Sequence, residues 1–202
     1  MPKIVDRDAR RSEIAHAVLR VVARDGVRGV TIRNVAREAG WSTGVIQHYF
    51  GDRQGLLMGA LHEAGQGVSS LIERLAAIDD PMERLLSLLE AGLPLDHERQ
   101  AMCRIFFYFW SEGIADPELG AALAAYYALW RGDVQSAIRD AQAVGQFTGH
   151  DPVRLAEWLV GLADGLGVQS MFDPITLRPS LLREHLADLV LRLALAPTTV
   201  LS

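Results

Sequence analysis

The sequence of 202 residues contains a single cysteine, Cys103. One thiol cannot form an internal disulfide, and it also excludes the paired-cysteine spacing of zinc and redox sites. Long apolar runs are lacking as well: no window of about 18 residues is apolar enough to cross a bilayer, and the first residues lack the apolar stretch of a signal peptide. We therefore expect a soluble, cytoplasmic protein with no membrane partner.

The motifs of the common enzyme classes are also missing. The six histidines are scattered, and none belongs to an HExxH pattern or to a helical pairing with carboxylates that would hold a metal ion. The sequence contains no GxSxG turn, no phosphate-binding loop and no dinucleotide-binding fingerprint that follows a strand. Cys103 lies in an aromatic stretch, where an inert core thiol is expected. The sequence therefore predicts no enzyme activity, no cofactor and no metal.

Strand-like alternation of apolar and polar residues is absent, whereas apolar residues recur at helical spacing in nine segments. The helices are expected at about 10–25, 31–40, 42–50, 54–78 and 100–113, from about 81, 117 and 152 onward, and at about 179–195. Three of them begin at Asp-Pro pairs, because aspartate caps free N–H groups and proline fits the first helical position. The expected fold class is all-α with nine helices.

Charge is distributed unevenly along the chain. Residues 1–53 carry one lysine and nine arginines against six acids, a net +4, whereas residues 54–202 carry ten arginines against nineteen acids, a net −9. A basic first part on an acidic remainder favours two domains with different roles, divided at residue 53. Random scatter within a short window is the alternative that charge alone leaves open.

The expected helix at 42–50 has two distinct faces. Apolar side chains gather on one side of a helical projection: Val45, Ile46, Tyr49 and Phe50. Small or hydrogen-bonding side chains take the other side: Thr43, Gly44, Gln47 and His48. This helix follows the one at 31–40 after a short turn, as in a helix-turn-helix, whose second helix enters the DNA major groove. Many helical pairs of this kind have no nucleic-acid role, so the spacing alone leaves both interpretations open.

The stretch from Thr31 to Leu57 resembles the DNA-binding domain of the TetR family of bacterial transcriptional regulators. Within it, Ser42-Thr-Gly-Val-Ile-Gln-His-Tyr-Phe50 is similar to the branch that contains the choline-responsive repressor of betaine synthesis. Two positions depart from the family pattern: Trp41 replaces a small aliphatic residue, and Arg53 replaces a lysine. The resemblance implies a helix-turn-helix DNA-binding domain in residues 1–53 and a helical ligand-binding and dimerisation domain in residues 54–202.

The resemblance also implies DNA contacts at particular positions: Thr31, Arg33, Thr43, Gly44, Gln47, His48, Tyr49 and Arg53. Thr43, Gly44 and Gln47 are expected to meet bases, and Gln47 can pair with an adenine edge. Arg33 is expected at a base edge or the groove wall, whereas the other four positions would contact the DNA backbone. A solvated surface residue is the alternative at each position, and for Thr31 a plain helix cap.

Aromatic side chains are frequent in the acidic part, and the resemblance implies that several line a small-molecule pocket: Phe106, Trp110, Tyr126, Tyr127 and Trp130. Carboxylates nearby, such as Glu112 or Asp164, would suit a cationic amine, because ammonium groups bind both aromatic faces and anions. Aromatic residues at this density are more often part of an ordinary core, which is the alternative here. The effector is therefore expected to be an unidentified small molecule, with cationic amines as one candidate class.

The last two expected helices carry leucine-rich faces: Leu159, Leu162, Leu166, Leu182, Leu186 and Leu189. Such faces can complete the core of one chain or pair with a second copy as a four-helix interface. Gly161 and Gly165 would permit a close helix–helix approach. The resemblance favours the homodimer, whose two-fold symmetry suits a palindromic DNA operator.

The expected function is that of a ligand-responsive repressor in the bacterial cytosol, at the nucleoid, which binds double-stranded DNA. The helix at 54–78 is expected to be the only continuous element that leaves the DNA-binding domain, and so to carry the ligand signal. The alternative is a helical small-molecule-binding or interaction protein without DNA binding. That alternative leaves the polar face of residues 43–48 unexplained.

Overall fold

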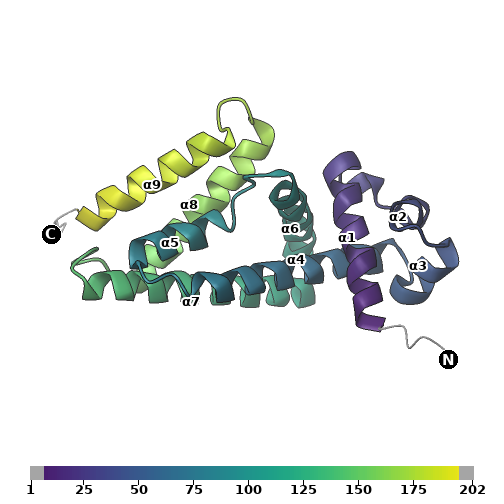
Figure 1. Cartoon of the computed structure of the whole chain (residues 1–202), viewed down its shortest axis with the longest axis horizontal. Coiled ribbons are helices and arrows are strands. Elements are labelled where there is room, and N and C mark those ends of the chain that lie inside the picture. Colours follow the sequence, from purple (N-terminus) through teal and green to yellow (C-terminus); the bar gives the residue numbers. More distant parts are fainter. Residues whose placement is uncertain (1–6, 196–202) are drawn as a thin grey trace. The chain divides into compact units, whose positions relative to one another are not determined.

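A computed structural model describes residues 7–195, and of Val68 it describes the backbone alone. Over this range the chain forms nine α-helices, one short 3-10 helix and no strand, which confirms the expected fold class (Figure 1). The first part contains α1 (Arg7–Asp25), η1 (Val27–Gly29), α2 (Ile32–Ala39), α3 (Thr43–Phe50) and α4 (Arg53–Leu75). The remainder contains α5 (Pro81–Glu90), α6 (His97–Ala115), α7 (Pro117–Ala143), α8 (Pro152–Phe172) and α9 (Pro179–Leu195).

Helix starts follow the capping rules that the sequence suggested. The carboxylates of Asp80, Asp116 and Asp151 accept hydrogen bonds from the first backbone N–H groups of α5, α7 and α8, and proline takes the first helical position in each. The predicted ends were less accurate. Helix α4 ends at Leu75 rather than near residue 78, and α6 begins at His97 because Asp96 accepts a hydrogen bond from the N–H of Arg99.

The chain divides into two compact units. The first, the head, comprises the residues up to Val68 together with Asp96–Phe109, and the second, the body, comprises Ser69–Leu95 and the residues from Trp110 onward. The compact units therefore do not follow the expected division at residue 53. Helix α4 is also not the only element that leaves the head, because α6 contributes residues to both units as well.

Residues of α4 and α6 complete the core that α1, α2 and α3 form in the head. Helix α1 packs against α2, and α2 packs against α3. Helix α1 carries apolar residues at helical spacing that are completely buried: Ile14, Val18, Val21 and Val22. The first turns of α4 bury Leu56 and Leu57 in the head. The Arg104 side chain of α6 donates hydrogen bonds to the carbonyls of Val22 and Ala23, at 3.2 and 2.9 Å, near the end of α1.

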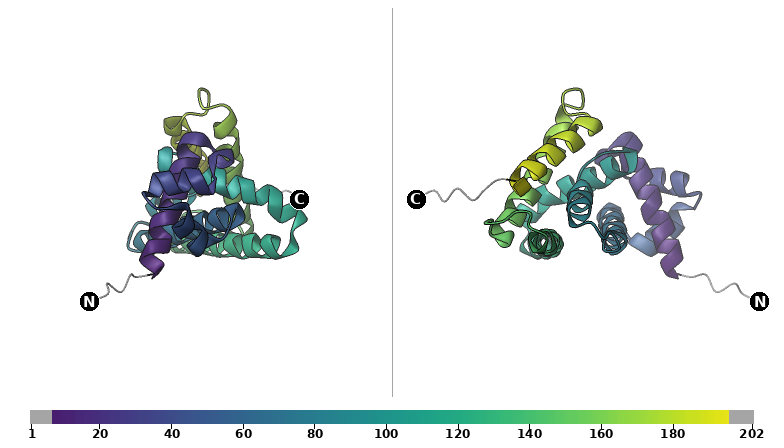
Figure 2. Two further views of the ribbon diagram at one scale, coloured as in Figure 1. Left: turned by 90° about the vertical axis from the view of Figure 1, so that its right-hand side faces the viewer. Right: turned by 60° about the vertical axis from the view of Figure 1, so that its left-hand side comes forward.

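The body is a layered bundle in which α7 packs against α5 and α8, and α9 packs against α5 (Figures 1 and 2). Three of the leucines expected at a dimer interface lie instead in the core of the body: Leu159 is 1% exposed, and Leu182 and Leu186 are 0% exposed. Their assignment to the interface is wrong, because the leucine face of α9 covers the helices of its own chain. Leu162 and Leu166 are half-buried against the same core.

No helix in the described part of the chain is both long and apolar enough to cross a membrane.

Candidate functional site

Helix α3 presents the polar face that the sequence predicted. The Ser42 hydroxyl caps its first turn by accepting a hydrogen bond from the N–H of Val45 at 3.3 Å. Ile46 and Phe50 are buried and hold the helix on the head. The opposite side is exposed, with all four of the predicted side chains: Thr43, Gly44, Gln47 and His48. The helix is thus fixed from behind and offers donors and acceptors to solvent.

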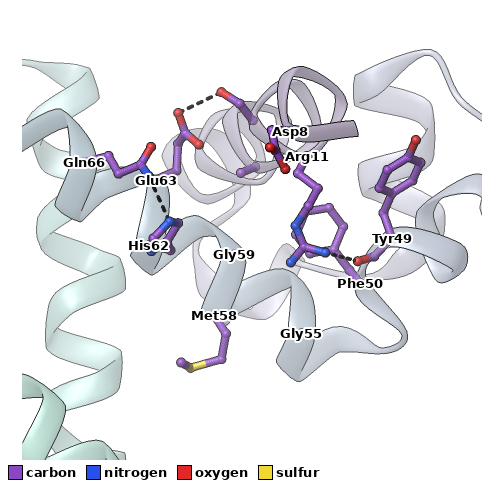
Figure 3. A pocket seen from close by; sticks show the side chains of 12 residues that line it. Asp8, Arg11, Tyr49, Phe50, Gly55, Met58, Gly59, His62, Glu63 and Gln66 are labelled. Carbon is purple, nitrogen blue, oxygen red and sulfur yellow. Dashed lines mark hydrogen bonds between the residues drawn. The ribbon is translucent and has the colours of Figure 1, made fainter. Parts of the chain in front are cut away.

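A cleft of about 500 Å³ lies beside α3, between α1 and α4 (Figure 3). Its floor forms because Gly55 and Gly59 of α4 lie so close to Phe50 that an added methyl group would overlap with that residue. Ser12 donates a hydrogen bond to Glu63 at 2.9 Å on one wall. On another, Arg11 donates to the Tyr49 carbonyl at 2.8 Å. This cleft could not be predicted from the sequence, because three separate helices contribute its lining.

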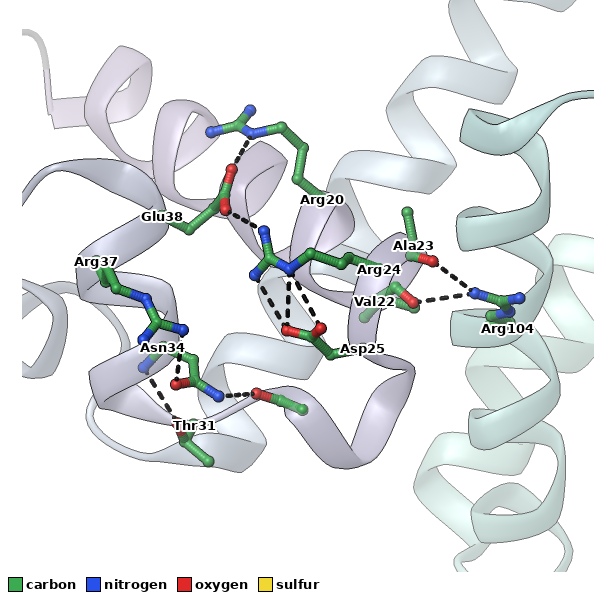
Figure 4. Close-up of polar contacts among 11 residues, drawn as sticks. Arg20, Val22, Ala23, Arg24, Asp25, Thr31, Asn34, Arg37, Glu38 and Arg104 are labelled. Carbon is green, nitrogen blue, oxygen red and sulfur yellow. Dashed lines mark hydrogen bonds and ion pairs between the residues drawn. The ribbon is translucent and has the colours of Figure 1, made fainter.

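The start of α2 is held by a small hydrogen-bond network (Figure 4). The Thr31 hydroxyl accepts a hydrogen bond from the N–H of Asn34 at 3.1 Å, which confirms its predicted role as a cap. The Asn34 side chain donates to the Gly29 carbonyl at 2.9 Å and accepts from Arg37 at 3.3 Å. Asn34 therefore fixes the turn that precedes α2, a role that sequence reasoning missed. The Thr31 hydroxyl can still donate its own proton to a phosphate.

Salt bridges connect helices α1 and α2. The Glu38 carboxylate accepts hydrogen bonds from both Arg24 and Arg20 at 2.8 Å (Figure 4). The bonds from these two guanidinium groups hold the pKa of Glu38 below its ordinary value. Arg24 also donates to Asp25. Two arginines of the basic head thus stabilise its own packing, whereas Arg33 is exposed on the second helix, as a DNA contact would require.

Arg53 lies where a phosphate contact was expected, but its guanidinium is used within the head. It donates hydrogen bonds to the carbonyls of Val30 and Val27, at 3.1 and 3.0 Å. The group also lies 5.9 Å from the centre of the Tyr108 ring. In this structure Arg53 therefore ties the start of α4 to the η1 turn, and the phosphate contact stays a prediction.

Trp41, the other departure from the family pattern, changes the packing of the turn between α2 and α3. Its indole N–H donates a hydrogen bond to the Glu13 carboxylate at 3.3 Å, and the Arg10 guanidinium lies 3.8 Å from the centre of its ring. The larger side chain thus adds two contacts between the turn and α1. Neither contact involves the exposed face of α3.

In the body, a group of aromatic and charged side chains gathers around Tyr127; we call it the Tyr127 cluster and define it as Trp110, Tyr126, Tyr127, Arg131 and Asp164. The ring of Tyr127 lies 6.0 Å from that of Trp110 and 5.7 Å from that of Tyr126, measured between centres. Its hydroxyl is hydrogen-bonded to the Asp164 carboxylate and to the indole N–H of Trp110. The Arg131 guanidinium lies 5.8 Å above its ring. The cluster thus joins aromatic faces, a carboxylate and a cation.

Burial is the largest influence on the pKa values of Asp164 and Tyr127 in this cluster. It raises the pKa of Asp164 to about 6, although the hydrogen bond from Tyr127 and the charge of Arg131 oppose that rise. Burial, together with the nearby Asp164 charge, also raises the pKa of the Tyr127 hydroxyl, which therefore remains a donor. The cluster thus contains a partly buried carboxylate whose ionised form is disfavoured by burial.

Trp130 and Phe106, which were also predicted to line the ligand pocket, lie outside the Tyr127 cluster. Trp130 is 4% exposed, its indole N–H donates to the Leu88 carbonyl at 3.1 Å, and its ring packs closely on Gly92. It supports Tyr127 from within the core and offers little surface to a ligand, so its assignment as a lining residue is corrected. Phe106 is half-buried and belongs to the head, so the structure does not group it with the Tyr127 cluster. Glu112 is exposed.

The outer faces of α8 and α9 leave apolar surface uncovered in this chain. Trp158 of α8 is 59% exposed, and Leu189 and Leu195 of α9 are 37% and 82% exposed. A methyl group added at Gly161 or Gly165 would meet no other atom within 4 Å. This surface, rather than the fully buried leucines, is available to a partner.

Comparison with known families agrees with this arrangement. Residues 14–59 match the model for bacterial regulatory proteins of the tetR family, and residues 81–195 match the C-terminal domain of BetI-type transcriptional repressors. The chain belongs to the TetR family. Its head contains the helix-turn-helix of that family, and its body is of the BetI type.

Individual transcriptional regulators are similar to this chain over different lengths. The transcriptional regulator BetI of Burkholderia lata is 34% identical over 121 residues, which cover 59% of this chain and 62% of BetI. The match thus spans less than two thirds of that relative's length. The transcriptional regulator PksA of Bacillus subtilis is 30% identical over 178 residues, 87% of this chain and 85% of PksA.

Solved structures include a putative transcriptional regulator from Saccharomonospora viridis in complex with choline. It has 29% sequence identity and a TM-score of 0.80, and the match covers 91% of this chain and 95% of that one. A putative TetR-family regulator from a Rhodococcus species has 27% identity and a TM-score of 0.71, over 90% of this chain and 98% of its own.

Proposed function

We propose that this TetR-family protein is a DNA-binding transcriptional repressor that reads a palindromic operator as a homodimer and responds to a cationic amine. One observation carries the proposal. Helix α3 is capped at its start, buried on one side and exposed along Thr43, Gly44 and Gln47, so it presents a rigid reading surface. A helix that only packed in a core would not need this surface.

The DNA contacts divide by chemistry. Thr43, Gly44 and Gln47 meet base edges in the major groove, where the Gln47 amide can pair with adenine. The absence of a side chain at Gly44 lets the helix start approach the groove, because an added methyl group there would project outward. Thr31, Arg33, His48 and Tyr49 contact the phosphate backbone or the groove wall: the first three are exposed, and the fourth is half-buried.

The Tyr127 cluster is the effector site. Aromatic faces attract ammonium groups, and a partly buried carboxylate supplies the opposite charge. The choline complex of the Saccharomonospora viridis regulator makes choline the first compound to test. An ammonium ligand would add positive charge beside Asp164, where burial now disfavours the ionised form.

The homodimer forms through the outer faces of α8 and α9. Trp158 supplies a large exposed apolar surface, and Gly161, one turn further on, allows a close helix approach. Exposed apolar patches of this kind are typical of protein interfaces. A two-fold dimer places two copies of α3 on the two halves of a palindrome.

Recovery of the DNA that the protein binds tests the proposal. Genomic fragments selected by the purified protein should share a palindromic sequence, and Gln47→Ala should lose about 1–3 kcal/mol of discrimination at one base pair in each half-site. Gln66 is an exposed glutamine on α4, so Gln66→Ala is the matched control and should leave the base preference unchanged. Selection of no common sequence would reject DNA reading and favour a small-molecule-binding or interaction protein.

A further inference from the structure

We propose that Arg11 of α1 is a positioning residue for the DNA-reading helix α3. This inference rests on the proposed function, because it concerns how the reading surface is held in place. Helix α3 has only eight residues, and its last carbonyls have no partner within the helix. The Gln47 carbonyl accepts a hydrogen bond from the N–H of Gly51 at 2.8 Å. The Tyr49 carbonyl accepts one from Arg11, also at 2.8 Å.

The Arg11 side chain also contacts the residue that ends α3. Its guanidinium lies 4.9 Å from the centre of the Phe50 ring, so one side chain reaches both the main chain and the last aromatic ring of the helix (Figure 3). Phe50 is itself immobilised, because it is buried and packs directly on Gly59 of α4. Arg11 thus links α1 to the end of α3 at a point where α4 already supports it.

Charge strengthens this link. A cation near the C-terminus of a helix interacts favourably with the helix dipole, and hydrogen bonds from a guanidinium are stronger than neutral ones. Base reading requires side chains held within about 0.5 Å of the productive geometry. Because α3 has barely two turns, loss of the anchor at its end would change the direction in which Gln47 points.

A direct contact between Arg11 and a phosphate is the competing role, and the two roles differ in salt dependence. A phosphate contact releases counterions, so its removal lowers the salt slope of binding by about one and weakens all DNA sequences alike. A positioning role leaves the salt slope unchanged. It lowers the affinity for the operator more than the affinity for unrelated DNA.

The experiment compares wild type, Arg11→Ala, Arg11→Lys and Arg7→Ala by fluorescence anisotropy, on the selected operator and on a scrambled duplex, over a range of salt concentrations. Arg7 is exposed at the start of the same helix and controls for the loss of one positive charge. For Arg11→Ala we expect about a tenfold lower ratio of operator to scrambled affinity, with the wild-type salt slope. Arg11→Lys keeps a charged donor but lacks the planar group, so it should recover part of that ratio. Arg7→Ala should keep the full ratio.

Three results would overturn the inference. A wild-type ratio in Arg11→Ala would show that the link does not position α3. An unchanged ratio with a salt slope reduced by about one would assign Arg11 to a phosphate. If Arg11→Ala lost its helical circular dichroism, the test would rest on Arg11→Lys. A folded Arg11→Lys whose ratio of operator to scrambled affinity did not rise above that of Arg11→Ala would then reject the role. Failure of wild type to select any operator would instead reject the proposed function on which the inference rests.

Discussion

Replacement of Asp164 by asparagine should stabilise the ligand-free protein at neutral pH and weaken its binding of cationic amines. Asparagine is close in shape and can still accept a hydrogen bond from Tyr127, so the substitution removes mainly the charge. Burial disfavours that charge, since it raises the pKa of Asp164 from the ordinary 3.8 to about 6. A residue that destabilises the empty protein but binds the ligand is typical of a functional site.

The size and sign of the effect follow from proton linkage. The folded state holds the Asp164 proton more tightly than the unfolded state, so ionisation lowers stability as pH rises between the two pKa values, and the loss is complete above the folded value. Two pKa units correspond to an upper limit of about 3 kcal/mol. Because Asp164 retains some contact with solvent, we expect about half of this limit at pH 8 and a smaller fraction at pH 5.

Urea unfolding of wild type and Asp164→Asn at pH 5 and pH 8 measures this effect. The variant should be more stable at both values, and its advantage should increase with pH. Isothermal titration with choline should show weaker binding to the variant at pH 8. Equal stabilisation at the two pH values would refute the argument, because the benefit would then not come from a charge that titrates near pH 6.

Two further variants test how closely the structure is packed, and two test the dimer. Gly59→Ala should destabilise the head by about 1–3 kcal/mol because the new methyl group displaces the Phe50 ring. Gly67→Ala should stabilise α4 by about 0.5–1 kcal/mol, because its new methyl group meets no neighbouring segment within 4 Å. Urea unfolding that changed the stability of both variants in the same direction would contradict this packing. Trp158→Glu should sediment as a folded monomer because it charges the exposed face. Leu186→Glu should unfold, since it buries a charge, and a folded monomeric Leu186→Glu would return that residue to the interface.

Features set by neighbours in the sequence were predictable. All nine helices in the described range were expected, because helical periodicity and aspartate–proline starts are local signals. The two faces of α3 were expected for the same reason. Once Ile46 and Phe50 take the inner side, geometry places Gln47 on the outer one.

Features set by distant residues were not predictable in this way. Periodicity showed that α9 has a leucine face, but it could not show whether the same chain or a second copy covers Leu182 and Leu186. The partners of Arg53 are backbone carbonyls of the η1 turn, which left no pattern in the side chains. Asp164 was noted as a carboxylate near aromatic residues, but its hydrogen bond to Tyr127 depends on the packing of α7 against α8.

The effect of choline on operator affinity tests the central claim most directly. Operator binding would be measured by fluorescence anisotropy in choline chloride and in sodium chloride at equal ionic strength, because salt alone weakens DNA binding. The account predicts a roughly 5- to 150-fold change in operator affinity for wild type, an equal change in choline affinity when operator is present, and little change for Asp164→Asn. Identical operator affinity in the two salts, with choline bound at the Tyr127 cluster, would contradict it.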